Sequence, residues 1–114
     1  MISPIGQING EARAERAWKR IQRSPSRVVF VRNGVTQAVQ TLRVELGNGG
    51  SSVGLPTGTI GVQGGVIYGI RDHKTLPDTN VKRLDRVVIE GKEYTVETIV
   101  KPPGEIQAFV VARG

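Results

Sequence analysis

The sequence has no cysteine, which excludes disulfide bonds, thiolate metal sites and a cysteine nucleophile. It has a single histidine, His73, so a histidine-rich metal cluster is excluded as well. No apolar run approaches the roughly 18 residues that a membrane-spanning helix requires. Residues 1–10 also lack the basic start and apolar middle of a signal peptide. We therefore expect a protein that works without a membrane, an export step or a cofactor.

Aromatic side chains are scarce as well, at 4% of the 114 residues, whereas glycine is abundant, with 15 copies. A chain of this length is expected to form one compact domain. With so few large side chains its core is small and its stability marginal. Such chains often gain further stability by assembling with partners.

Acidic residues are the minority, and the net charge is +6. Residues 1–27 contain six basic and two acidic side chains, whereas the remaining 87 contain ten basic and eight acidic ones. The basic excess is therefore mostly N-terminal. It predicts anionic surroundings, either nucleic acid or an acidic protein surface.

Residues 11–23 are predicted to form a short helix, within an N-terminal basic arm over residues 1–26. Apolar residues recur with helical spacing on one face: Ala14, Ala17, Trp18 and Ile21. Asn9 is a candidate N-cap, and Ser24-Pro25 ends the pattern. Because a helix this short is marginal alone, the face that carries Trp18 and Ile21 is a candidate docking face. It packs either on the rest of the chain or on a neighbouring subunit.

The same helix is expected to carry a candidate basic contact face on its other side, formed by Arg13, Arg16, Arg20 and Arg23. Such a row can follow phosphates, meet an acidic neighbouring subunit or remain in solvent. Aromatic residues, which single-strand binders use to stack bases, are missing between the arginines. The three alternatives stay open at this point.

Residues 27–114 are predicted to form a single mainly β domain, a small antiparallel β-barrel or sandwich. One strand is expected at residues 27–32 and another at residues 35–46, with Asn33-Gly34 as a strong hairpin signal between them and a bulge near residues 37–40. A further strand follows at 61–70, a second hairpin turns at Gly91, and the last strand spans 105–113. Residues 71–82 form a polar loop between them.

Residues 47–60 are predicted to form a long flexible loop, because this stretch is rich in glycine and serine and has no charged residue. A phosphate cradle is excluded because no helix pattern follows the glycines. The central part is a candidate channel-facing element: Gly49, Gly50, Ser51, Ser52, Val53, Gly54, Leu55, Pro56 and Thr57.

Catalytic patterns are absent, and we expect no enzyme activity. His73 stands beside Asp72 in the polar loop, and together with Asp78 they are better explained as a hydrogen-bonded turn than as a catalytic or metal site. Four carboxylates of the second hairpin are expected on a solvated sheet face rather than in a glycosidase pair: Asp85, Glu90, Glu93 and Glu97.

Several stretches resemble the head-closure proteins of tailed bacteriophages, which are also called head-to-tail stoppers or connectors. A polar loop leads into Asp85-Arg-Val87, and a return strand follows as Glu90-Gly-Lys-Glu-Tyr-Thr-Val96. The last strand is preceded by Pro103-Gly-Glu-Ile-Gln-Ala108, and the early hairpin reads Val31-Arg-Asn-Gly-Val-Thr-Gln37. The similarity covers roughly residues 27–114, and the basic helix lies outside it.

The resemblance implies a virion neck protein that is made in the host cytoplasm. Such a protein forms a homo-oligomeric ring, with twelve copies as the expected number and six as the alternative. The ring would lie between the portal/adaptor ring and the tail terminator or tail tube protein, close the channel over the packaged double-stranded DNA, and dock the tail. Two alternatives remain, a small basic nucleic-acid-binding barrel and a tail terminator or tail-completion ring.

Overall fold

The structure, a computed structural model, describes residues 5–47 and 64–112. The candidate channel-facing residues 49–57, and almost all of the predicted loop 47–60, lie outside the described residues.

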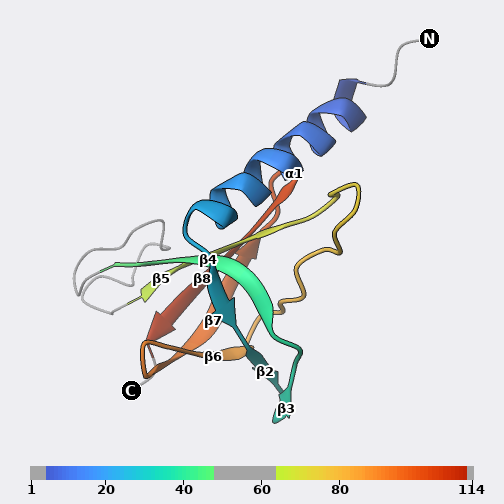
Figure 1. Cartoon of the computed structure of the whole chain (residues 1–114). Helices are drawn as coiled ribbons and strands as arrows, with labels where there is room; N and C mark the ends of the chain where they lie inside the picture. The colour runs from blue at the N-terminus through green and yellow to red at the C-terminus, as the bar shows by residue number, and fades with distance from the viewer. Residues whose placement is uncertain (1–4, 48–63, 113–114) are drawn as a thin grey trace.

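The N-terminal element is a single helix, α1 (Ile5–Arg23), which lies across one end of the sheet (Figure 1). It is longer than the predicted helix 11–23, so Asn9 lies inside it and is not its N-cap. The C-terminal limit is confirmed. The amide of Ser24 donates to the carbonyl of Ile21 at 3.1 Å, and Pro25 cannot continue the helix.

The remaining elements are strands, which confirms the prediction of a mainly β fold with one short helix. All pairings are antiparallel, and the order across the sheet is β1-β4-β5-β8-β7-β6-β2-β3. The strands are β1 (Ser26–Val28), β2 (Phe30–Arg32), β3 (Val35–Thr36), β4 (Gln40–Leu46), β5 (Gly64–Ile70), β6 (Arg86–Ile89), β7 (Lys92–Val100) and β8 (Glu105–Ala112).

The sheet curls into a half-barrel, and the chain around Val29 explains why. β1 pairs with β4 at one end of the strand order, whereas β2 pairs with β6 near the other end. Only Val29 separates β1 from β2. Two distant parts of the sheet are therefore held together by neighbouring residues. The predicted single strand at 27–32 is in fact two strands.

Both predicted hairpin turns are confirmed by their backbone angles. Asn33 and Gly34 have φ values of 52° and 79°, and Glu90 and Gly91 have 52° and 78°. Two consecutive positive φ values are the signature of the tight turn that matches strand twist. The bulge predicted near residues 37–40 is wrong: the strand ends at Thr36 and a separate strand begins at Gln40, and these two strands pair with different partners.

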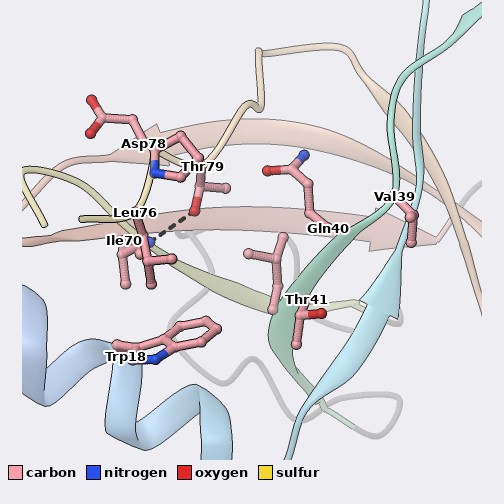
Figure 2. A pocket seen from close by; sticks show the side chains of 10 residues that line it. Trp18, Val39, Gln40, Thr41, Ile70, Leu76, Asp78 and Thr79 are labelled. Atoms are coloured by element: carbon pink, nitrogen blue, oxygen red, sulfur yellow. Dashed lines mark hydrogen bonds between the residues drawn. The ribbon is translucent and has the colours of Figure 1, made fainter.

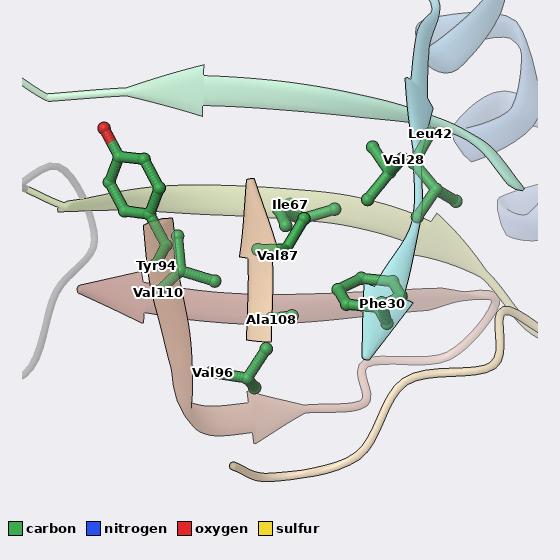
Figure 3. Packing of buried hydrophobic residues seen from close by; sticks show 9 residues of the cluster. All are labelled: Val28, Phe30, Leu42, Ile67, Val87, Tyr94, Val96, Ala108 and Val110. Atoms are coloured by element: carbon green, nitrogen blue, oxygen red, sulfur yellow. The ribbon is translucent and has the colours of Figure 1, made fainter. Parts of the chain in front are cut away.

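The interior of the half-barrel forms the main core (Figure 3). Tyr94 and Val96 point inward from β7, as their alternation with polar residues predicts, and Phe30 fills the opposite side at 0% exposure. Burying one such side chain contributes roughly 1.5–3 kcal/mol. The full cluster is Val28, Phe30, Leu42, Ile67, Val87, Tyr94, Val96, Ala108 and Val110.

A second, smaller cluster joins α1 to the sheet. Ala17 and Ile21 pack against Ile70 of β5, and the partly buried Trp18 and Leu76 cover them. The β7–β8 turn also reaches the helix, because a Cβ at Gly104 would collide with the backbone of Arg13 and Ala14. The apolar face of α1 therefore docks on the rest of its own chain. Among the described residues, no helix is long and apolar enough to cross a membrane.

Candidate functional site

The polar loop after β5 is held by hydrogen bonds around His73, whose side chain is 5% exposed. Its Nδ1 accepts from the backbone amides of Thr75 and Leu76 at 3.2 and 3.1 Å. With Nδ1 acting as an acceptor, Nε2 carries the proton and donates to Glu15 Oε2 at 2.8 Å. The histidine therefore ties the loop to α1.

The rest of this loop follows the predicted hydrogen-bonded turn. The amide of Asp72 donates to Asp78 Oδ1 at 3.0 Å. Within the described residues, no group of three His, Cys, Asp or Glu side chains is placed to hold a metal ion.

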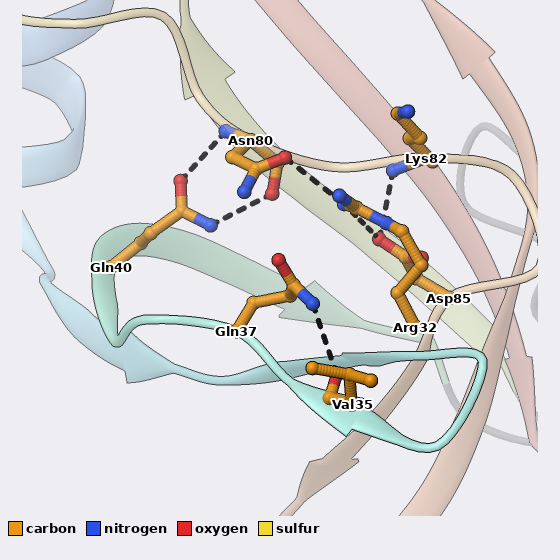
Figure 4. Close-up of polar contacts among 7 residues, drawn as sticks. All are labelled: Arg32, Val35, Gln37, Gln40, Asn80, Lys82 and Asp85. Atoms are coloured by element: carbon orange, nitrogen blue, oxygen red, sulfur yellow. Dashed lines mark hydrogen bonds and ion pairs between the residues drawn. The ribbon is translucent and has the colours of Figure 1, made fainter.

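The other end of the loop is held by Asp85 (Figure 4). Its side chain is 1% exposed. Arg32 donates to both carboxylate oxygens, at 3.0 and 2.8 Å, and the amide of Lys82 donates at 2.8 Å. The hydrogen bonds that Arg32 donates to Asp85 raise the pKa of Arg32 above its usual value. The prediction that Asp85 lies on a solvated sheet face is wrong, since this carboxylate is buried and hydrogen-bonded within the fold.

The two side chains of Asn80 and Gln40 complete this network. The side-chain nitrogen of Gln40 donates to the backbone carbonyl of Asn80. The backbone amide of Asn80 donates to the side-chain oxygen of Gln40, and both distances are 2.8 Å. Arg32 also donates to the Asn80 side chain at 3.0 Å (Figure 4). Loop 71–85 is therefore tied by hydrogen bonds to α1, to the start of β4 and to β2.

A cleft of about 270 Å³ lies between α1, the start of β4 and the polar loop (Figure 2). Trp18 forms one wall, Leu76 and Ile70 lie next to it, and the 47% exposed Val39 stands at its rim. The hydroxyl of Thr79 accepts from the amide of Ile70 at 2.9 Å. The lining is mostly apolar and contains no constellation of catalytic side chains.

The basic face of α1 lies along the side where the helix meets β8. Arg20 forms an ion pair with Glu105 at 3.1 Å, and its guanidinium lies 5.8 Å from the centre of the Tyr68 ring. Arg43 donates to the carbonyl of Arg20 at 3.5 Å. Arg20 is therefore held against the sheet rather than projecting away from it.

The other three arginines of this face are exposed: Arg13, Arg16 and Arg23. In the described part of the chain, none of them has an ion pair or a side-chain hydrogen bond. Arg13, Arg16 and Arg20 line a pocket of about 300 Å³ together with Ala17 and Glu105. The structure thus brings three of the four predicted basic residues around one hollow, and Arg23 lies outside it.

The predicted docking face, Trp18 and Ile21, is mostly covered by its own sheet. Ile21 is 1% exposed, and Trp18 is half-buried at the cleft.

A second surface, which the sequence did not single out, is an apolar groove of about 420 Å³ over β2 and β6. Val29 and Val88 are 36% and 65% exposed there, and Val31 also lines the groove. Its other lining residues include Arg27, Arg86 and Glu93. Exposed branched side chains grouped in this way are typical of a surface that contacts another protein. We refer to it below as the valine groove.

Sequence reasoning missed the partners that hold these surfaces in place, because they are distant in the chain. Glu105 lies 85 residues from Arg20, Asp85 lies 53 from Arg32, and His73 lies 58 from Glu15. No local pattern pairs such residues. The alternation in β6, with Arg86 and Val88 on its exposed face, was the one available signal for the valine groove.

No family model matches the chain, and neither a curated protein nor a solved structure matches it.

Proposed function

We propose that this chain is a structural subunit of a virion neck. Copies of it form a ring between the portal/adaptor complex and the tail, which closes the DNA channel after packaging and provides the docking surface for the tail. The proposal starts from the resemblance to head-closure proteins. In the structure, the residues that carry this resemblance serve the fold: Asp85 anchors the polar loop, and Tyr94 and Val96 fill the core.

The observation that carries the proposal is the valine groove. Val88 leaves 65% of its surface in solvent, beside Val29 and Val31, in a chain whose cores are small. Burial of apolar surface contributes about 25 cal/mol for each Å² removed from water. A neighbouring copy seated on the groove therefore supplies stability that the isolated chain lacks. A contact between two different surfaces of identical subunits closes into a ring when the rotation allows it.

The proposal is tested by the oligomeric state and by the particle. At high concentration the purified chain should form rings with a central channel, visible by electron microscopy and measurable by light scattering. Val88→Asp places a charge in the groove and should reduce ring formation at least tenfold. Val35→Asp is the matched control, because Val35 is 62% exposed but does not line the groove.

Imaging of intact particles that contain the chain then decides its place. A ring between the portal side and the tail, with DNA lost from particles that lack it, supports the neck function. A ring that contacts the tail tube alone would assign the chain to tail completion. A chain that stays monomeric at every concentration, and is absent from the neck, would refute the proposal.

A further inference from the structure

We propose that the pocket between α1 and β8, lined by Arg13, Arg16 and Arg20, binds the phosphates of a nucleic acid backbone, with duplex DNA as the ligand. This site does not depend on the ring, because all of its residues come from one chain. We call it the arginine pocket.

The first argument is that positive charge in the pocket has too few acidic partners within the fold. Arg13 and Arg16 are exposed, and within the described residues nothing neutralises them. The acidic residues of the same helix lie elsewhere. At about 100° per residue, Glu11 and Glu15 are turned well away from Arg16, and the Glu15 carboxylate is taken by His73 at 2.8 Å. Three guanidinium groups therefore face one acid, Glu105, around a hollow of about 300 Å³.

The second argument is that Arg20 is preorganised. Its ion pair with Glu105 uses Nη1, and its guanidinium lies over the Tyr68 ring. A guanidinium has five N–H donors, so several remain for a phosphate oxygen. The Tyr68 phenol is neutral at physiological pH, as an ordinary tyrosine is, and its ring offers a π face to the cation. A donor already fixed in place loses little conformational entropy when it binds.

The third argument concerns the shape of the ligand. From Arg13 to Arg20 the helix rises by seven residue steps, or about 10 Å at 1.5 Å per residue. A duplex carries one charge per roughly 1.7 Å of axis, so about six phosphates lie within that length. Among the residues that the structure describes, no aromatic side chain lines the pocket to stack an unpaired base. The site therefore fits a regular line of phosphates and does not read sequence.

The test is the affinity of the full chain for a 20-base-pair duplex, measured by fluorescence anisotropy between 50 and 200 mM NaCl. Three neutralised phosphates predict a slope of about −2.7 in log K against log salt, or roughly a 40-fold loss of affinity over this range. Arg16→Gln should reduce the slope by about 0.9, so that the loss falls to roughly 12-fold. Arg13→Gln should do the same.

The matched control is Lys82→Gln, which removes one positive charge from an exposed side chain outside the pocket. It should leave the slope nearly unchanged, and circular dichroism should show intact helix in all variants. If Lys82→Gln lowers the slope as much as Arg16→Gln, binding follows net charge and the pocket proposal is wrong.

Two competitors separate the other sources of negative charge. Polyglutamate that displaces the duplex at equal charge concentration, with the same loss in Arg16→Gln, would overturn the proposal in favour of an acidic protein surface. Inorganic phosphate that displaces it far better than chloride at equal ionic strength would assign the pocket to free phosphate instead. Neither result bears on ring formation, which is measured through Val88.

Discussion

The interior of the half-barrel and the layer beneath α1 are stabilised in different ways. Nine buried side chains from seven elements of the sheet form one continuous cluster, which includes Phe30 and Tyr94. Beneath α1, the buried cluster of described residues consists of Ala17, Ile21 and Ile70, and polar contacts lie around it: Arg20 to Glu105 and His73 to Glu15. The sheet has a core that supports itself, whereas the helix depends on a few apolar contacts and on peripheral ion pairs.

This difference indicates where binding surfaces are free to form. Residues of the inner core are buried against one another, so they expose almost no surface that a partner could contact. The arginine pocket and the valine groove both lie outside that core, one beside the thin helix layer and the other on the outer face of the sheet.

The largest effect is expected inside the half-barrel. Phe30→Ala should lower the free energy of unfolding by about 4 kcal/mol, because the ring is fully buried and its removal leaves a cavity. Urea denaturation followed by circular dichroism and by the fluorescence of Trp18 should show both signals moving together. A loss below about 1 kcal/mol would mean that this core is not the main source of stability.

The next effect is expected at the anchor of loop 71–85. Asp85→Ala leaves Arg32 without its carboxylate, which costs about 3 kcal/mol when the lost partner is buried. Urea denaturation measures this loss. Glu97→Gln, on an exposed carboxylate of the same hairpin, serves as the control and should change stability by less than about 0.5 kcal/mol. Equal losses in the two variants would contradict the structural role of Asp85.

A smaller and more local effect is expected beneath α1. Ile21→Ala should cost about 2 kcal/mol, and most of it should appear as release of the helix. The Trp18 fluorescence transition should then move to lower urea than the transition of the strand signal, because the sheet core remains intact. Coincident transitions would show that helix and sheet unfold as one unit.

The smallest effect is expected at alkaline pH. Burial, with a lesser effect of Glu90, raises the pKa of Tyr94 above its ordinary value of 10.0. The folded state therefore holds this proton more tightly than the unfolded state. The corresponding stability is complete below about pH 10 and is lost as pH rises through the folded pKa. Tyr94→Phe should flatten the alkaline decline in the free energy of unfolding. If the decline in this variant is unchanged, other titrating groups cause it.

Much of the fold was predictable because its signals are local. Asn33-Gly34 fixes a hairpin through two positive φ values, and the alternation around Tyr94 and Val96 assigns the inner face of β7. The same locality explains the errors. The prediction of one continuous strand at 27–32 is wrong, because nothing in these residues indicates that β1 and β2 pair with strands far apart in the sheet. The prediction that the helix begins at residue 11 is wrong as well, because α1 begins at Ile5 although Gly6 and Gly10 are poor helix formers and Asn9 is typical of an N-cap.

The sequence alone determined the strand and helix types, the turns, the basic stripe of α1 and the absence of cysteine chemistry, since each depends on neighbouring residues. The tertiary structure decided that Asp85 is buried under Arg32, that Arg20 is held by Glu105 and Tyr68, and that the valines of β2 and β6 share one groove. These contacts join residues dozens of positions apart. Their existence depends on how the sheet curls, and curling is a property of the whole set of strand pairings rather than of any one segment.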